Sequence, residues 1–344
     1  MAIETSELVD SLNSVTSIPV VPFREGAIDF DAHAKNIRYL MDNNHLEGER
    51  RRVIGIAGTS LIHHIGRDEQ VRLMGFTGEQ MAGKGVLMSG IAPNPIADAE
   101  ELIRREASLP VPPDCYLVMP LTGVGNAEGI FRNHLDMAER LGRETGARFL
   151  YYLRNKAERE TAIRLLNESE FFIGLKIGTD VGDVTTIVEG VNAGAGIVIW
   201  GVGDRSTGPA GLGTLGHTSG INVAFVRASD AINNAQRSGD LEASQRVENE
   251  IAAFEDIRFR DGRMYNYSAV VEAMHLVGSD AIDGGDGGPF NPRVPAAVEA
   301  GWGGRADCAV PGRVARAPGA ALPPGRPGRG RPVRAPAGSH DCHD

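Results

Sequence analysis

The alternation of short β-like runs with longer amphipathic stretches constrains the fold of this chain more than any other feature. Between about residues 15 and 240 there are eight apolar runs, and about 10 to 20 helix-like residues separate most of them. A parallel sheet covered by helices requires such near-continuous apolar strands, each followed by a helix. The runs are "SIPVVPF", "RVIGIAG", "GVLMSGI", "CYLVMP", "RFLYYL", "FFIGLKIG", "GIVIWGVG" and "SGINVAF".

Eight such units predict an α/β fold, a closed (β/α)8 TIM barrel, in preference to an open doubly wound sheet, which stays as the structural alternative. The seventh unit is the weakest, because its helix candidate "GPAGLGTLG" is short and rich in glycine. Two later stretches, "FVRASDAINNAQRSGDLEASQRVENEIAAFEDI" and "NYSAVVEAMHLVG", predict additional C-terminal helices. We therefore expect the barrel over residues 1–240 and a helical extension packed on it over residues 241–300.

The composition changes abruptly near residue 301. Residues 301–344 are rich in Ala, Gly, Pro and Arg and have almost no large aliphatic side chains. Such a segment cannot bury enough apolar area to offset its ordering entropy. A tail read in the wrong frame of a GC-rich gene is the favoured interpretation, since the residue types in excess have GC-rich codons; a disordered extension and a basic interaction tail are the alternatives.

Charge and cysteine content exclude several classes of function. The formal charge is −10, and residues 302–344 contribute seven Arg and three Asp, a net +4, so the remainder carries −14. An acidic body disfavours nucleic acid and anionic membranes as partners. The absence of an apolar run of about 18 residues and the polar, acidic start predict a cytoplasmic protein. Three cysteines without CxxC or Cys/His spacing predict no disulfide framework and no metal site, and we expect no cofactor.

Lys176, in the sixth run, is the most informative single residue. Only four lysines occur in the chain, and this one is placed in an apolar, β-branched strand near its end. In a (β/α)8 barrel the active site lies at the C-terminal ends of the strands. Desolvation there would lower the pKa of the amine and leave it neutral, ready to attack a carbonyl carbon and form an imine. The alternative is a structural lysine paired with a barrel carboxylate.

The fifth run, "FLYYLRNK", supplies candidate partners. Tyr151 and Tyr152 point to opposite faces of the strand, so only one phenol can face the barrel interior and exchange protons with an imine. Arg154 and Lys156 could hold a carboxylate, although solvation at the surface is equally compatible with either residue.

The turn "GTS" after the second run could also hold a carboxylate. Hydroxyl and backbone N–H groups of Thr59 and Ser60 can cradle an anion at such a glycine-preceded turn. The same three residues are common in plain turns.

Together these residues resemble the dihydrodipicolinate synthase and N-acetylneuraminate lyase family of Schiff-base barrel enzymes, from "SIPVVPF" to "PFNPRVP", residues 17–295. "GLKIGTD" is similar to the family's Gly-hydrophobic-Lys strand, and "FLYYLRN" to its Leu-Tyr-Asn-hydrophobic-Pro strand. The resemblance implies that Lys176 forms the imine, that Tyr151 relays protons, and that Thr59 and Ser60 bind the pyruvate carboxylate. It implies further substrate contacts near the ends of the last three strands, at Thr179, Gly203, Asp204, Thr218 and Ser219.

The resemblance implies a class I lyase or aldolase that acts on pyruvate or a related 2-oxo acid, without metal or cofactor, as a homo-oligomer (dimer or tetramer). The commonest activity of the family is 4-hydroxy-tetrahydrodipicolinate synthase, a step of lysine biosynthesis. N-acetylneuraminate lyase and 2-keto-3-deoxy sugar acid aldolase or dehydratase activities are alternatives within the family. A metal-dependent barrel aldolase and a barrel that binds a 2-oxo acid without turnover are alternatives outside it.

Several positions depart from the family pattern. The turn is not followed by Gly-Glu, and Pro120 precedes Leu121 and Thr122 where dihydrodipicolinate synthases have a tyrosine pair. Tyr152 stands in place of an asparagine, and Lys156 in place of an arginine. These differences concern substrate specificity more than imine chemistry.

Overall fold

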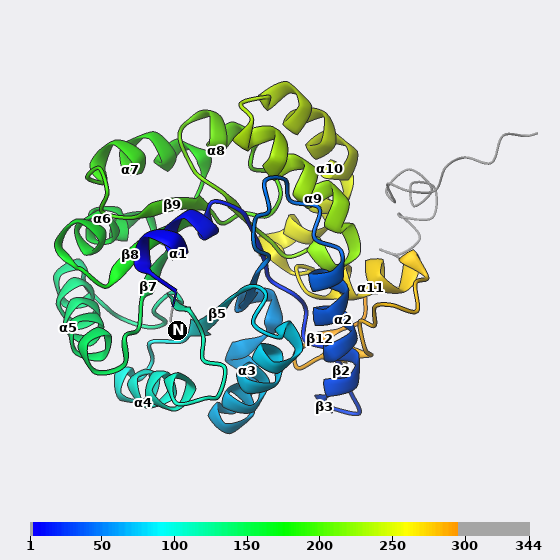
Figure 1. Cartoon of the computed structure of the whole chain (residues 1–344), viewed down its shortest axis with the longest axis horizontal. Helices are drawn as coiled ribbons and strands as arrows, with labels where there is room; N and C mark the ends of the chain where they lie inside the picture. The colour runs from blue at the N-terminus through cyan, green and yellow to red at the C-terminus, as the bar shows by residue number, and fades with distance from the viewer. Residues whose placement is uncertain (1–2, 295–344) are drawn as a thin grey trace, which may run out of the picture. The chain divides into compact units, whose positions relative to one another are not determined.

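The computed structural model describes residues 3–294, so the predicted tail over residues 301–344 lies outside the described residues. Eight parallel strands close into a barrel with the order β1-β10-β9-β8-β7-β6-β5-β4 (Figure 1). They are β1 (Val15–Ser17), β4 (Val53–Ile56), β5 (Val86–Ile91), β6 (Cys115–Val118), β7 (Phe149–Leu153), β8 (Phe172–Ile177), β9 (Ile197–Trp200) and β10 (His217–Ser219). The predicted (β/α)8 barrel is confirmed, and because the sheet is closed the open-sheet alternative is wrong.

Helices surround the strands (Figure 1). Between successive strands and after the last one lie α2 (Phe30–Asp42), α3 (Arg67–Met81), α4 (Ile96–Ala107), α5 (Ala127–Thr145), α6 (Arg159–Glu168), α7 (Val184–Gly190), α8 (Thr207–Gly211) and α9 (Asn222–Arg237). The predicted additional helices are α10 (Leu241–Arg263) and α11 (Ser268–Val277). Two short hairpins, β2 (Phe23–Arg24) with β3 (Ala27–Ile28) and β11 (Gly287–Gly288) with β12 (Asn291–Pro292), complete the described part. No helix within residues 3–294 is long and apolar enough to cross a membrane.

The first and last predicted strands are displaced from the observed ones. "SIPVVPF" overlaps β1 only at Ser17, because Pro19 and Pro22 lack the N–H that a strand ladder needs. "SGINVAF" overlaps β10 only at Ser219, and its apolar residues instead form the buried face at the start of α9. Short apolar runs do not distinguish a strand from a buried helix segment.

Helix α1 (Thr5–Leu12) lies at the N-terminal ends of the strands. Its Thr5 hydroxyl accepts a hydrogen bond from Arg148 Nε, 2.8 Å away, just before β7 begins. Leu8 and Leu12 are buried beneath the helix. Because α1 covers this end, the opposite end of the barrel is the one left for a binding site.

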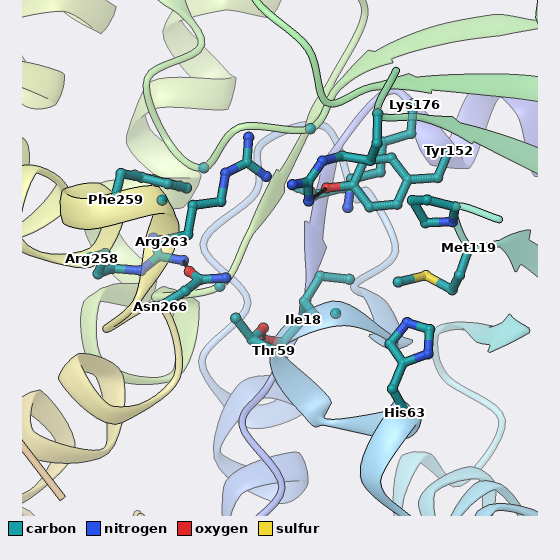
Figure 2. A pocket seen from close by; sticks show the side chains of 18 of the residues that line it. Ile18, Thr59, His63, Met119, Tyr152, Lys176, Arg258, Phe259, Arg263 and Asn266 are labelled. Carbon is teal, nitrogen blue, oxygen red and sulfur yellow. Dashed lines mark hydrogen bonds between the residues drawn. The ribbon is translucent and has the colours of Figure 1, made fainter. Parts of the chain in front are cut away.

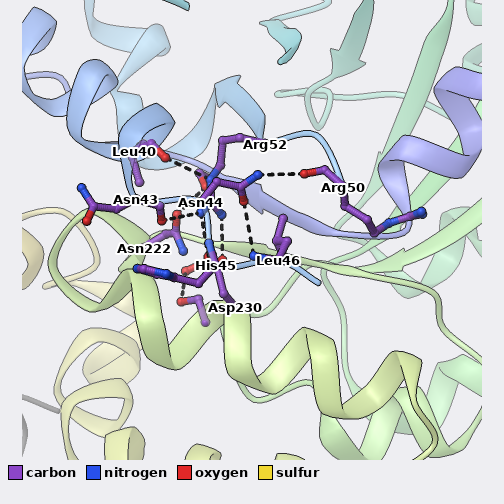
Figure 3. A network of polar contacts seen from close by, with 12 residues as sticks. Leu40, Asn43, Asn44, His45, Leu46, Arg50, Arg52, Asn222 and Asp230 are labelled. Atoms are coloured by element: carbon purple, nitrogen blue, oxygen red, sulfur yellow. Dashed lines mark hydrogen bonds and ion pairs between the residues drawn. The ribbon is translucent and has the colours of Figure 1, made fainter. Parts of the chain in front are cut away.

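A buried ion pair joins the start of β4 to α9 and to the segment after α2 (Figure 3). Arg52 Nη1 and Nη2 each donate to a carboxylate oxygen of Asp230 at 2.7 Å, and both side chains are fully buried. Arg52 Nη2 also donates to the carbonyl of Asn43, and Asp230 accepts the N–H of His45. Since every nitrogen and oxygen of the two charged groups has a hydrogen-bond partner, the pair fixes the position of α9 on the barrel.

A buried acid on α4 gives the first prediction. Burial raises the pKa of Glu106 to about 8, although the Ser89 hydroxyl and the charge of Arg105 oppose the shift. A carboxyl whose folded pKa lies above its unfolded value costs stability as the pH rises from about 4.5 to 8. Glu106→Gln should therefore leave the free energy of unfolding nearly unchanged at pH 4.5 and raise it by about 2 to 4 kcal/mol at pH 8. Urea unfolding at the two pH values measures the difference, and equal effects at both would contradict the account.

Candidate active site

Lys176 lies at the C-terminal end of β8 with its side chain inside the barrel. Leu175 and Ile177 on either side pack in the apolar layer that also contains residues of α5 and α6, so the alternation of the strand turns Lys176 inward. The lysine is 5% exposed. Among residues 3–294 no carboxylate forms an ion pair with it, which argues against the structural-lysine alternative.

The tyrosine beside Lys176 is Tyr152, not Tyr151. Tyr152 is the register partner of Lys176 across β7 and β8, and the lysine Nζ lies 4.0 Å from the centre of its ring. Tyr151 points to the opposite face, is 1% exposed, and donates its hydroxyl hydrogen to Glu158 Oε2 at 2.9 Å. Tyr151 therefore does not fit the predicted relay phenol in this structure, because the neighbouring residue occupies the inward position.

A cavity of about 440 Å³ opens around these two side chains (Figure 2). Its wall contains strand-end and loop residues, and also residues of the C-terminal helices: Ile18, Gly58, Thr59, His63, Met119, Pro120, Thr122, Tyr152, Arg154, Lys176, Gly201, Gly203, Thr218, Gly220, Arg258, Phe259, Gly262, Arg263 and Asn266. In Figure 2 Lys176 and Tyr152 face Arg263 and Phe259 across this space.

The charges around the cavity shift both central pKa values. Burial is the main cause that lowers the pKa of Lys176; Tyr152 opposes the shift, and Arg154 and Arg263 add to it. Burial alone would raise the pKa of Tyr152, but the charges of Lys176, Arg154 and Arg263 together outweigh it and lower the pKa to about 8. The site therefore holds an amine that loses its proton readily beside a phenol that does the same.

Gly201, at the end of β9, provides the space that Lys176 occupies. A Cβ at this position would lie 2.7 Å from Cε of Lys176 and 2.5 Å from the carbonyl oxygen of Ile177. Gly201→Ala should displace the lysine side chain and destabilise the fold by about 1 to 3 kcal/mol, and it should reduce the imine formation that the sequence predicts for Lys176. Gly208→Ala is the matched control, because nothing lies within 4 Å of a Cβ there. Thermal unfolding and borohydride trapping measure the two effects, and trapping at the wild-type rate in Gly201→Ala would contradict this role of the glycine.

The predicted "GTS" turn is only partly available to a ligand. Thr59 lines the cavity, and its hydroxyl donates to the carbonyl of Ile18 at 2.8 Å. Ser60 is fully buried, its hydroxyl donates to the carbonyl of Pro19, and its N–H donates to the carbonyl of Ala57. Both donors of Ser60 are thus used within the turn, and Ser60 does not fit the predicted carboxylate contact.

The residues predicted near β9 and β10 divide between the cavity and the layer behind it. Gly203 and Thr218 line the cavity. Asp204 is fully buried behind it, where its carboxylate accepts hydrogen bonds from Ser219 Oγ at 2.7 Å and lies 3.2 Å from His217 Nε2. Asp204 and Ser219 therefore do not fit as substrate contacts in this arrangement; they hold the loop after β9 against β10.

The remaining predicted contacts differ in position. Arg154 lies at the mouth of the cavity, with Nη1 3.4 Å from the hydroxyl of Tyr152. Lys156 is directed to the surface, where it is 61% exposed and forms an ion pair with Asp180. Thr179 is partly buried but is not part of the cavity wall. Lys156 and Thr179 therefore do not fit the predicted substrate contacts, because neither side chain lines the cavity and Lys156 is already paired at the surface.

Sequence reasoning missed the contribution of α10 to the site. Arg258, Phe259 and Arg263 come from this helix and line the cavity together with Asn266, which follows it. The one local signal is the Asp-Gly pair at residues 261–262, a turn dipeptide that interrupts the helical pattern. Within residues 3–294 no group of three His, Cys, Asp or Glu side chains is arranged to hold a metal ion.

Comparison with known proteins shows similarity in fold. No protein-family model and no curated protein matches the sequence. Many solved structures do match: dihydrodipicolinate synthase from Bacillus clausii has a TM-score of 0.75 at 20% identity, covering 88% of this chain and 97% of that one. The enzyme from Oceanobacillus iheyensis has a TM-score of 0.75 at 22% identity, covering 88% of this chain and 100% of that one. The enzyme from Thermotoga maritima has a TM-score of 0.73 at 20% identity, covering 86% of this chain and 98% of that one. The chain therefore has the TIM-barrel fold of these synthases over almost their whole length.

Proposed function

We propose that this protein is an imine-forming lyase or aldolase of 2-oxo acids that belongs to the dihydrodipicolinate synthase and N-acetylneuraminate lyase family. The observation that carries the proposal is Lys176: a buried lysine, without a carboxylate partner among the described residues, at the catalytic end of a barrel strand and against a phenol. The fold shared with solved dihydrodipicolinate synthases supports it.

The reaction begins with neutral Lys176 Nζ attacking the ketone carbon C2 of the substrate. The C2–Nζ bond forms, the carbonyl oxygen takes up a proton, and loss of water leaves a protonated imine. The imine nitrogen then accepts the electron pair of a bond to C3, which gives an enamine. Either a C3–H bond breaks and its proton passes to a base, or the C3–C4 bond breaks and C4 leaves as an aldehyde once its hydroxyl has lost a proton. In the synthetic direction the enamine carbon C3 attacks an aldehyde, and water finally releases the product and restores the amine.

Tyr152 is the residue placed to move protons in these steps. Its phenol lies beside Nζ, and a pKa of about 8 lets it give and regain a proton near neutral pH. Thr59 and Arg258 are the candidate contacts of the carboxylate attached to C2, and the Thr59 hydroxyl exchanges its bond to the Ile18 carbonyl for one to that carboxylate. A Cβ on Gly220 would lie 2.4 Å from Arg258 Nη2 and 3.3 Å from Thr59 Cγ2, so both side chains lie next to this glycine in the wall.

Borohydride trapping tests the proposal. The full chain is incubated with pyruvate and sodium cyanoborohydride, and its intact mass is measured with and without a metal chelator. We expect a mass gain equal to one reduced pyruvate imine, unaffected by the chelator. Activity that the chelator abolishes, without any adduct, would indicate a metal-dependent aldolase. Stabilisation by pyruvate with neither adduct nor turnover would indicate a barrel that only binds the acid.

The second substrate has to be found by assay. Leu121 and Thr122 stand where the resemblance places the tyrosine pair of dihydrodipicolinate synthases. Of the two, Thr122 lines the cavity, and its N–H and hydroxyl both contact Asn94 Oδ1. This wall therefore lacks a phenol for relaying protons. A panel of aspartate semialdehyde with pyruvate, N-acetylneuraminate, and 2-keto-3-deoxy sugar acids compares the 4-hydroxy-tetrahydrodipicolinate synthase activity with its alternatives.

A further inference from the structure

The charged side chains of the cavity wall are all cationic. Four of its side chains are arginine or lysine, namely Arg154, Lys176, Arg258 and Arg263, and no aspartate or glutamate lines it. The chain as a whole carries a formal charge of −10. A concentration of positive charge inside an acidic protein focuses the electric field and attracts anions into the cavity.

A break in α10 positions one of these cations, Arg263. Arg260, Asp261 and Gly262 have non-helical backbone angles, and the chain turns there before it continues toward α11. The turn directs Arg263 over the cavity, where Nη2 donates to the carbonyl of Gly178 at 3.1 Å. Gly178 follows β8 directly, so this contact fixes Arg263 relative to the strand that carries Lys176.

The two arginines of α10 are in different electrostatic situations. Arg258 is buried, paired with Glu255, and donates to Asn266 Oδ1 at 2.7 Å. Arg263 forms no ion pair with any acid in the described residues, and burial lowers its pKa. The ring of Phe259 contacts both, with guanidinium carbons 5.0 Å and 5.5 Å from its centre. Arg258 therefore already has one carboxylate partner, whereas Arg263 has none among residues 3–294.

Arg263 also shares its surroundings with other uncompensated cations. The pKa of Tyr152 is lowered by the positive charges of Arg154, Arg263 and Lys176. Each of the two arginines also lowers the pKa of Lys176 by repulsion. Within residues 3–294 Arg154 has no carboxylate partner either. Holding like charges together at a partly buried site costs free energy, and an anion bound between them offsets that cost.

We propose that Arg263 and Arg154 form a second anion-binding subsite, so that the preferred substrate is a 2-oxo acid with a second acidic group. This inference rests on the proposed function, in which Thr59 and Arg258 hold the carboxylate next to C2. The second acidic group then lies beside Tyr152, bound by the guanidinium groups of Arg154 and Arg263. Arg263 acts as a specificity residue contributed by the C-terminal helices rather than by the barrel.

The test separates anion binding from imine chemistry. Calorimetry on the full chain compares glutarate with pentanoate, two acids of equal chain length that differ in the second carboxylate and have no ketone. We expect glutarate to bind at least about tenfold more tightly, the range expected for one charged hydrogen bond. Cyanoborohydride trapping then compares 2-oxoglutarate with 2-oxopentanoate, and the dicarboxylate should saturate the enzyme at a correspondingly lower concentration.

Variants assign the preference to the arginine. Arg263→Gln should remove the preference for glutarate, and Arg263→Lys should restore part of it, because the charge remains although the fork geometry is lost. Arg132→Gln, at an exposed position on α5, removes one charge elsewhere and should leave the preference unchanged. Equal affinities for the two acids in the wild-type protein, or an unchanged preference in folded Arg263→Gln, would overturn the inference. Tight glutarate binding without any trapped imine would keep the subsite and refute the proposed chemistry.

Discussion

Replacement of Lys176 by methionine is expected to abolish turnover of 2-oxo acids and, at the same time, to stabilise the protein. The amine is the proposed nucleophile, and no other lysine lines the described cavity. Methionine has a similar length but no charge to desolvate, so we expect the free energy of unfolding to rise by about 1 kcal/mol or more. Activity assays and thermal unfolding measure the two effects on the same preparations.

Lys84→Met is the matched control for this substitution. Lys84 is exposed in the turn after α3, so the change removes an equal charge without altering the cavity. We expect wild-type activity and no gain in stability from it. Residual turnover above background in Lys176→Met would show that the amine is not the nucleophile, and a loss of stability would show that the buried charge is compensated in the folded protein.

The two adjacent tyrosines should respond in opposite ways to loss of the hydroxyl group. Tyr152→Phe removes the phenol beside Nζ and should lower kcat by about 10² to 10⁴-fold with little change in stability. Tyr151→Phe leaves Glu158 Oε2 without its donor and should cost about 1 kcal/mol of stability with little change in kcat. Steady-state kinetics and urea unfolding of both variants provide the comparison.

The pH profile gives an independent measure of Tyr152. Because the pKa of its phenol is about 8, the wild-type rate should change through an ionisation near that pH. The same ionisation should be absent in Tyr152→Phe and retained in Tyr151→Phe. If Tyr151→Phe were the variant that lost both the rate and the ionisation, the relay would have to be assigned to Tyr151 after all.

The sequence predicted the barrel and the lysine but not which tyrosine accompanies it. Strand β8 carries a lysine between Leu175 and Ile177, and its burial follows from the apolar run alone. Side-chain alternation along β7 allows either Tyr151 or Tyr152 to face the barrel interior. Which of them does so depends on the register between β7 and β8. That register shifts between Phe149 and Leu150, an irregularity that no residue pattern indicates.

The cationic wall could not be predicted because it depends on tertiary structure. Arg258 and Arg263 lie about 80 residues after Lys176 in the chain, in a segment that reads as an amphipathic outer helix. Their position over the cavity requires the turn at residues 260–262 and the missing side chain of Gly220, beside which Arg258 packs. Similarly, Ser60 has a hydroxyl that suits a carboxylate, but the neighbouring carbonyl of Pro19 accepts its hydrogen.

The central claim, that Lys176 forms the imine, is tested most directly by locating the reduced adduct. Protein trapped with pyruvate and cyanoborohydride is digested, and the peptides that contain Lys35, Lys84, Lys156 and Lys176 are compared by mass spectrometry. The account predicts one adduct per chain, on Lys176, formed far faster than any modification of the other three. An adduct distributed over the exposed lysines, or its formation at the wild-type rate in Lys176→Met, would contradict it.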